Sequence, residues 1–394
     1  MGGRREPAWS LAGSARSARE ARIATVRHLR HAPVARLWQA ARLLSAYQLH
    51  LAHTDHPAAA RTLLFGGMGY RPPFPADWAA AAEMVLTDEA RYLAEADLYV
   101  LTPPMCDVVI AAAQSLSAHD LELLSDGDLP SKTGVVVLHR PVIVRTISGD
   151  LADDRAFSWR FPAQIDRPVS FSRRTGDVPA VRMSIYHDTS GPIRPDSFLN
   201  LAAQARAQGT PLPPLLLDSI RCVPLRYVPT SQHAHDRERF AATARAAGRN
   251  TRQQAEVLGR DENRVIGEYT TGRQVDDRDD TFMLRFLYAF WRLCEQRIAE
   301  AEAAPAGHSA QVLADRAGVP AEVRVVRLRR TESSGHDSDH AGHDWQHRWV
   351  VRMHKVRQWY PSLQQHKVIY RGPYIKGPDD KPFLDGELVR ALVR

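Results

Sequence analysis

Cysteine is scarce in this chain. There are three, Cys106, Cys222 and Cys294, and no two of them form a Cys-x-x-Cys pair. An odd and widely spaced set argues against a disulfide framework and a cysteine zinc site, and it predicts a cytoplasmic protein. The chain also lacks any run of about eighteen apolar residues, so we expect no membrane span. The Gly66–Gly69 loop lacks the Gly-x-Gly-x-x-Gly spacing of a dinucleotide site, and we expect no cofactor.

The chain has 394 residues, of which 44% are hydrophobic and 25% are charged. This composition is typical of globular proteins and leaves room for two or three domains. Helical and strand patterns are both present, so we predict an α+β fold with a helical N-terminal arm, a mixed α+β central domain and a small antiparallel β-rich C-terminal module. The expected parts are a basic helical arm and loop over 1–79, an α+β domain over 80–228, a helical region over 229–304 and the basic β-rich module over 305–394.

Local patterns support these divisions. Residues 15–50 show apolar residues every three or four positions, and Pro33 should divide that helical stretch. The runs Leu98–Leu101 and Val135–Leu138 are typical of buried strands. A strongly apolar helix is expected over 281–302, with the aspartates before it at the positive end of its dipole.

The small excess of positive charge lies at the two ends of the chain. The net charge is +7, and residues 1–50 alone hold nine arginines and two glutamates. Residues 345–376 hold seven lysines and arginines and no acid. Two basic ends that flank a nearly neutral body indicate a polyanion partner such as DNA or RNA.

The acid-free stretch 345–376 is the most informative part of the sequence. It adds six aromatic residues and three histidines to its seven cations. Cations neutralise phosphates, and exposed aromatic rings stack on unpaired bases. We therefore predict a nucleic-acid-binding protein that contacts phosphates and bases through this segment. The residues expected at that surface are Arg352, Lys355, Arg357, Gln358, Trp359, Tyr360, Lys367, Arg371, Tyr374 and Lys376.

Two alternative functions stay open. The first is a metal-independent ribonuclease or toxin in which His354, Tyr360 and His366 supply the acid and the base. The second is a protein–protein interaction module that binds no nucleic acid. The loop over 336–347 is rich in histidine and aspartate, but no fixed secondary structure imposes ligand geometry on it, so we predict no metal site.

The segments Trp349–Ser362 and His366–Phe383 resemble the C-terminal signature of a family of actinobacterial proteins found in phage and plasmid neighbourhoods. The similarity extends over residues 80–383 and includes Ala96–Tyr99. It implies a mobile-element or phage origin. Since no activity is established for that family, it implies no chemistry. The chain departs from the family at Met353, where the family has Gly, and at Lys355, where it has Trp.

Overall fold

The computed structural model describes most of the chain. The described residues are 9–117, 120–121, 126–165, 178–225, 231–266, 274–277, 280–295, 299–328, 345–351, 354–360, 365–371, 374–378 and 381–382. The fold is α+β, as the sequence predicted, with a mixed central sheet and small antiparallel sheets at the C-terminus. None of the helices in these ranges is long and apolar enough to cross a membrane.

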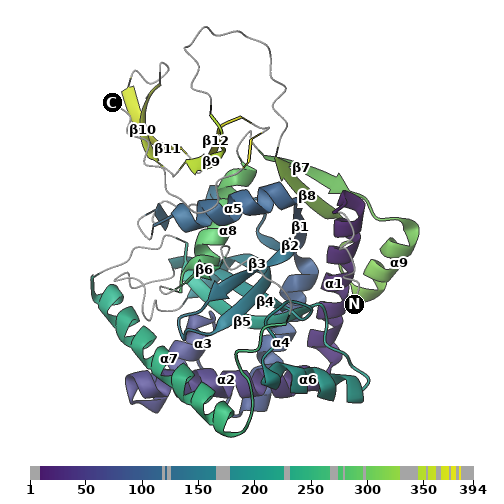
Figure 1. Ribbon diagram of the computed structural model, residues 1–394, viewed down its shortest axis with the longest axis vertical. Coiled ribbons are helices and arrows are strands. Elements are labelled where there is room, and N and C mark those ends of the chain that lie inside the picture. The colour runs from purple at the N-terminus through teal and green to yellow at the C-terminus, as the bar shows by residue number, and fades with distance from the viewer. Residues whose placement is uncertain are drawn as a thin grey trace.

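A mixed sheet of eight strands forms the centre of the described structure (Figure 1). Its order is β5-β4-β3-β2-β1-β8-β7, and β6 pairs with β2 beside this path. Strand β1 runs parallel to β2 and β8, and β6 runs parallel to β2. The pairs β2–β3, β3–β4, β4–β5 and β7–β8 are antiparallel. The strands are β1 (Asp97–Leu101), β2 (Thr133–Arg145), β3 (Leu151–Ile165), β4 (Val178–Asp188), β5 (Leu215–Pro224), β6 (Val275–Asp276), β7 (Ala299–Ala304) and β8 (Val323–Leu328).

Helices cover both faces of this sheet (Figure 1). Side chains that alternate along β2 enter two different cores, Val135 and Val137 the first and Val136 and Leu138 the second. A strand buried on both faces reads as a continuous apolar run, which explains why the short runs in β1 and β2 were recognisable. The first core is closed by α1 (Leu11–His31), α2 (Pro33–Thr54), α3 (Pro57–Gly67), α4 (Trp78–Glu95), α6 (Asp196–Ala207) and α9 (His308–Ala317), and the second by α5 (Pro103–Ser115) and α8 (Phe282–Cys294).

The N-terminal helices do not form a separate arm. Pro33 divides α1 from α2 as expected, but both helices pack on the sheet. Val26 and Leu29 are buried in the first core, and so is Val34. The apolar stripe of these helices is therefore the inner face of the central domain, because only the sheet offers it a surface to bury against.

Two further predictions about secondary structure are wrong. The helix expected over 281–302 ends at Cys294, and Ala299–Ala304 is instead the edge strand β7. The β-rich C-terminal module was expected over 305–394, but β8, within that range, lies in the central sheet between β1 and β7. Val323 and Val325 face the first core and Val326 the second, so burial on both faces holds β8 in the sheet.

Four short strands form the C-terminal sheets at one end of the molecule, beyond α5 (Figure 1). Strands β9 (Trp349–Val351) and β12 (Tyr374–Lys376) pair antiparallel, and Val350 and Ile375 pack on the second core. Strands β10 (His354–Tyr360) and β11 (Gln365–Arg371) form a second antiparallel pair. The helix α7 (Ser231–Val257) lies at the opposite end of the molecule, against α2.

Candidate functional site

The structure distributes the predicted nucleic-acid residues over two sheets. Most of them fall on β10 and β11, and two fall on β12. Arg352 lies outside the described residues. The residues on β10 are Lys355, Arg357, Gln358, Trp359 and Tyr360, those on β11 are Lys367 and Arg371, and those on β12 are Tyr374 and Lys376.

The pairing of β10 with β11 puts the basic positions of the two strands on opposite faces. Lys355 and Arg357 pair with Tyr370 and Val368, whereas Lys367 and Arg371 pair with Gln358 and His354. Alternate positions of a strand share one face. Lys355, Arg357 and Trp359 therefore occupy positions on one face of this hairpin. Trp359 keeps 48% of its surface exposed.

A second exposed tryptophan lies beside the other C-terminal sheet. Trp345 is 41% exposed, and its ring centroid is 4.7 Å from that of Trp349, which is buried. The Nζ atom of Lys376 lies 5.8 Å from the centroid of the Trp345 ring, within range of a cation–π interaction. The buried ring of Trp349 thus supports an exposed ring that already accepts a cation.

The three residues predicted for a ribonuclease do not converge. His354 begins β10 and Tyr360 ends it, so about six strand residues of roughly 3.3 Å each separate them, close to 20 Å. His366 pairs with Trp359, whereas Tyr360 pairs with Gln365, which puts His366 and Tyr360 at positions on opposite faces. The strand pairing therefore gives these three positions no common face.

Five of the nine N-terminal arginines are engaged in contacts within the protein. Arg19 and Arg22 are buried, and Arg30 lies beside them on α1. All three donate to backbone carbonyls: Arg19 to Ala321 and Ala304, Arg22 to Ala96 and Pro320, and Arg30 to Ala317. Arg36 and Arg42 form ion pairs with Glu83 and Asp218. The charge argument for a polyanion therefore rests on the C-terminal segment.

Metal-ligand candidates do not gather in the described part of the chain. Residues 336–344 of the histidine-rich loop lie outside it. Within the ranges described, no three histidine, cysteine or acidic residues are arranged to hold a metal ion. Asp277 acts as the sequence predicted for an acid before a helix, because its Oδ1 atom accepts hydrogen bonds of 2.9 Å from the backbone N–H groups of Thr281 and Phe282.

The sequence did not reveal a cluster of acids around His187. The Nδ1 atom of His187 lies 3.3 Å from Oδ1 of Asp153 and 4.0 Å from Oδ1 of Asp154. Its Nε2 atom lies 3.1 Å from Oδ1 of Asp218, which Arg42 also pairs with. Neighbours on a regular strand point to opposite faces, but a register shift after Asp154 lets both β3 acids approach one imidazole.

Burial and charge act against each other in this cluster. Burial alone would lower the pKa of His187, but Asp218 and Asp153 raise it well above its ordinary value. The pKa of Asp154 is raised to about 8, chiefly by burial; the nearby His187 acts to lower it, and Asp218 and the other nearby acids act to raise it. Both ring nitrogens of His187 lie within 3.3 Å of a carboxylate oxygen, so the imidazolium is the cation that links β3, β4 and β5 here.

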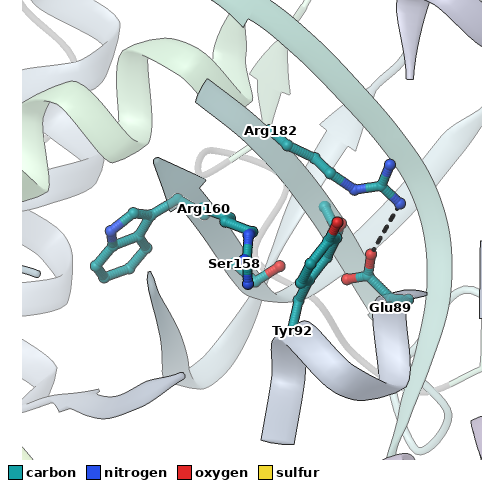
Figure 2. A pocket seen from close by; sticks show the side chains of 7 residues that line it. Glu89, Tyr92, Ser158, Arg160 and Arg182 are labelled. Carbon is teal, nitrogen blue, oxygen red and sulfur yellow. Dashed lines mark hydrogen bonds and ion pairs between the residues drawn. The ribbon is translucent and has the colours of Figure 1, made fainter. Parts of the chain in front are cut away.

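A small pocket opens between α4 and the central strands β3 and β4 (Figure 2). Its volume is about 200 Å³, including its opening to solvent. Figure 2 shows the Tyr92 ring between Arg160 on one side and Arg182 with Glu89 on the other. The lining residues are Glu89, Tyr92, Ser158, Trp159, Arg160, Arg182 and Ser184.

Arg182 is the buried centre of this pocket. Its side chain is 6% exposed, and its Nη1 atom donates to the Met68 carbonyl at 2.7 Å. Its Nη2 atom lies 3.4 Å from Oε2 of Glu89 and 3.3 Å from the Tyr70 hydroxyl. The Tyr186 hydroxyl donates to the other oxygen of Glu89. The ion pair is therefore held on both sides by tyrosine hydroxyls.

Neither polar cluster was identified from the sequence, although each left a signal. The adjacent acids Asp153 and Asp154 lie within a strand otherwise rich in apolar residues. Ser158 and Arg160 alternate with aromatic residues along β3, a pattern typical of a strand with one solvent-facing side. Helix α4 covers that side, and nothing local in the sequence indicates this.

Comparison with known proteins gives no match: no family model, no curated protein and no solved structure aligns with the chain. The resemblance of the C-terminal signature to an actinobacterial family therefore stays a prediction. The functional argument rests on the residues and contacts of the chain itself.

Proposed function

We propose that the protein binds nucleic acid through its C-terminal strands, with cations on phosphates and tryptophan rings on bases. The observation that carries the proposal is the exposure of Trp345 and Trp359 within a stretch that contains seven lysines and arginines and no acid. Exposed aromatic rings offer stacking faces for unpaired bases, and here they lie among cations. The absence of acids from the same stretch removes local repulsion of a phosphate backbone.

The surroundings of Trp345 favour stacking on unpaired bases. Its ring is supported by Trp349, so little conformational freedom is lost when a base stacks on it. Lys376 lies over the same ring, and no carboxylate within the described residues pairs with it. One bound nucleotide would then meet an aromatic face and an ammonium group together. We therefore expect single-stranded DNA or RNA to bind better than duplex.

Fluorescence anisotropy with labelled single-stranded DNA and RNA tests the proposal. The logarithm of affinity should fall linearly with the logarithm of salt concentration, with a slope of about −3 or steeper for several phosphate contacts. Trp359→Ala should weaken binding by about tenfold, since base stacking on an aromatic ring contributes about 1–3 kcal/mol. Lys376→Gln should lower the slope by about 0.7 for the lost phosphate contact.

Matched variants separate these effects from general damage. Trp9 is also an exposed tryptophan, at 37%, but it lies at the start of α1, so Trp9→Ala should leave affinity unchanged. Lys132 is exposed on the central domain, so Lys132→Gln should leave the salt slope unchanged. A flat salt response, or equal losses for Trp9→Ala and Trp359→Ala, would reject the proposal.

A further inference from the structure

We propose that the pocket beside Tyr92 binds a small oxyanion, a phosphate group, between Arg160, Arg182 and the hydroxyls of Ser158 and Ser184. This site lies in the central domain and is independent of the C-terminal strands. It uses only residues that line the pocket in Figure 2.

The sheet itself places these four side chains on one side. Ser158 pairs directly with Ser184 across β3 and β4, and Arg160 pairs directly with Arg182. Positions two apart on paired strands share a face, so the four residues form a square of two hydroxyls and two guanidinium groups. Like charges directly opposite each other are unfavourable in a sheet. Glu89 and Glu95 compensate the two arginines here, and an oxyanion could replace the more exposed of these acids, Glu95.

Tyr92 covers the two guanidinium groups without neutralising them. The Cζ atom of Arg160 lies 4.2 Å from the centroid of the Tyr92 ring, and that of Arg182 lies 5.3 Å from it. The ring fixes the direction of both cations through cation–π contacts. Guanidinium groups held in place ahead of binding lose less entropy when they clasp an oxyanion.

Arg182 has a donor that nothing in the described structure satisfies. Both terminal nitrogens have acceptors, but its buried Nε–H group has none. Buried polar groups nearly always have a hydrogen-bond partner, and an unpaired one is costly. An oxygen of a bound phosphate in the pocket would accept that hydrogen bond, and this orphan donor is independent of the sheet pairing.

The acids near the pocket leave one cation available for a ligand. Glu89 lines the pocket, but its two oxygens already accept from Tyr186 and Arg182. Glu95 pairs with Arg160 at 2.8 Å, and both groups are partly open to solvent, at 52% and 32%. Exposed ion pairs of this kind are weak, so Arg160 can exchange Glu95 for a phosphate oxygen.

The size of the pocket limits the ligand. Sites for drug-sized molecules usually enclose about 300–1,000 Å³. Most of the roughly 200 Å³ here is open to solvent, and the enclosed part of about 10 Å³ has room for a single water-sized group, such as one phosphate oxygen. A free phosphate ion and the terminal phosphate of a larger molecule present the same oxygens, and the larger molecule would extend past Arg160 into solvent.

Thermal unfolding of the full chain in inorganic phosphate, with chloride used to keep ionic strength constant, tests the site. The wild-type protein should show a saturable rise in Tm. Arg160→Gln should weaken phosphate binding about tenfold, the effect of one lost charge-assisted hydrogen bond. The matched control is Arg91→Gln, because Arg91 also stacks on Tyr92, at 4.9 Å, but pairs with Asp88 and does not line the pocket.

Ser184→Ala is a second, milder variant in case Arg160→Gln impairs folding. It should weaken phosphate binding about threefold to tenfold, as expected for one lost hydrogen bond. A nucleoside monophosphate should bind as well as inorganic phosphate if a terminal phosphate is the natural ligand, and more weakly if free phosphate is. Acetate should not replace either.

Three results would overturn the assignment: no saturable rise in Tm with phosphate, equal responses in the wild type and Arg160→Gln, or a response to acetate alone. None of them bears on the C-terminal strands, because Arg160→Gln leaves the residues near Trp345 and Trp359 untouched. Failure of one proposal is therefore distinguishable from failure of the other.

Discussion

The Nε2 atom of His187 lies 3.1 Å from Oδ1 of Asp218, and this contact joins β4 to β5 inside the central sheet. On the other side of the ring, Asp153 of β3 lies 3.3 Å from Nδ1. One imidazolium therefore links three neighbouring strands through two carboxylates. The side chain of Asp153 is only 3% exposed, so its charge depends on this histidine for compensation.

Replacement of His187 by alanine should destabilise the fold. It removes the cation between Asp153 and Asp218 and leaves buried acids to repel each other. Loss of one member of a buried ion pair costs about 3–5 kcal/mol, and the 23% exposure of His187 places it near the lower end. Urea unfolding measures the change. His308→Ala, at an exposed position on α9, should change stability by less than about 0.5 kcal/mol.

Asp154→Asn should stabilise the protein at alkaline pH. Burial raises the pKa of Asp154 to about 8, so the folded state keeps a proton that the unfolded state releases above about pH 4. The folded state binds more protons in this window, so stability falls as pH rises from about 4 to 8. The amide resembles the protonated acid and should increase stability at pH 8 by about 1–3 kcal/mol.

The check is how the difference in stability between Asp154→Asn and the wild type changes with pH. At pH 4 the wild-type carboxyl is protonated in the folded state, so the gain from the amide should nearly vanish. A stability difference that stays constant between pH 4 and pH 8 would show that the amide acts through packing and not through the proton.

Much of the fold followed from the sequence, because buried strands and amphipathic helices have local signatures. The runs in β1 and β2 and the break at Pro33 are where they were expected. The edge strand β7 was mistaken for the end of a helix. Its Ala-Glu alternation has weak strand propensity, and it is a strand because β8 offers it an open edge.

The polar clusters could not be predicted either, because they depend on which strands pair and in which register. His187 meets Asp218 only because β4 and β5 pair in one register, and Arg160 faces Arg182 only because β3 and β4 do. Such contacts depend on strand order, and no local pattern encodes strand order. The N-terminal arginines illustrate this too: Arg22 reads as surface charge in the sequence and is fully buried in the fold.

Acidification should destabilise the protein through His50. The pKa of His50 is lowered to about 4, chiefly by burial and also by the nearby charges of His53 and Arg221. Between about pH 6.5 and pH 4 the unfolded state binds a proton at His50 and the folded state does not. The contribution of His50 to the free energy of unfolding is therefore fully present above about pH 6.5 and is lost as pH falls towards 4. The loss should reach about 3 kcal/mol near pH 4.

A pH series of urea unfolding experiments on the wild type and His50→Gln checks this. The ring of His50 stacks on Phe240 at 5.2 Å, so the variant should lose some stability at pH 7. The informative quantity is the slope of the free energy of unfolding against pH. Between pH 6.5 and pH 4 this slope should be shallower in His50→Gln than in the wild type. Parallel curves for the two proteins would contradict the role of His50, since other buried histidines such as His28 would then explain the acid sensitivity.

Arg22→Met should be more damaging than its place in a basic N-terminal segment indicates. Arg22 is fully buried, and its guanidinium donates to the carbonyls of Ala96, at 2.8 Å, and Pro320. Methionine fills most of the volume but leaves two buried carbonyls without donors, at a cost of about 1–3 kcal/mol each. We expect the free energy of unfolding, measured with urea, to fall by about 2–4 kcal/mol.

Arg16→Met, at an exposed position on the same helix, is the matched control and should be nearly neutral. Equal effects of the two variants would mean that the N-terminal arginines act as surface charge after all, and the first helix would then have to be considered again as a contact for polyanions.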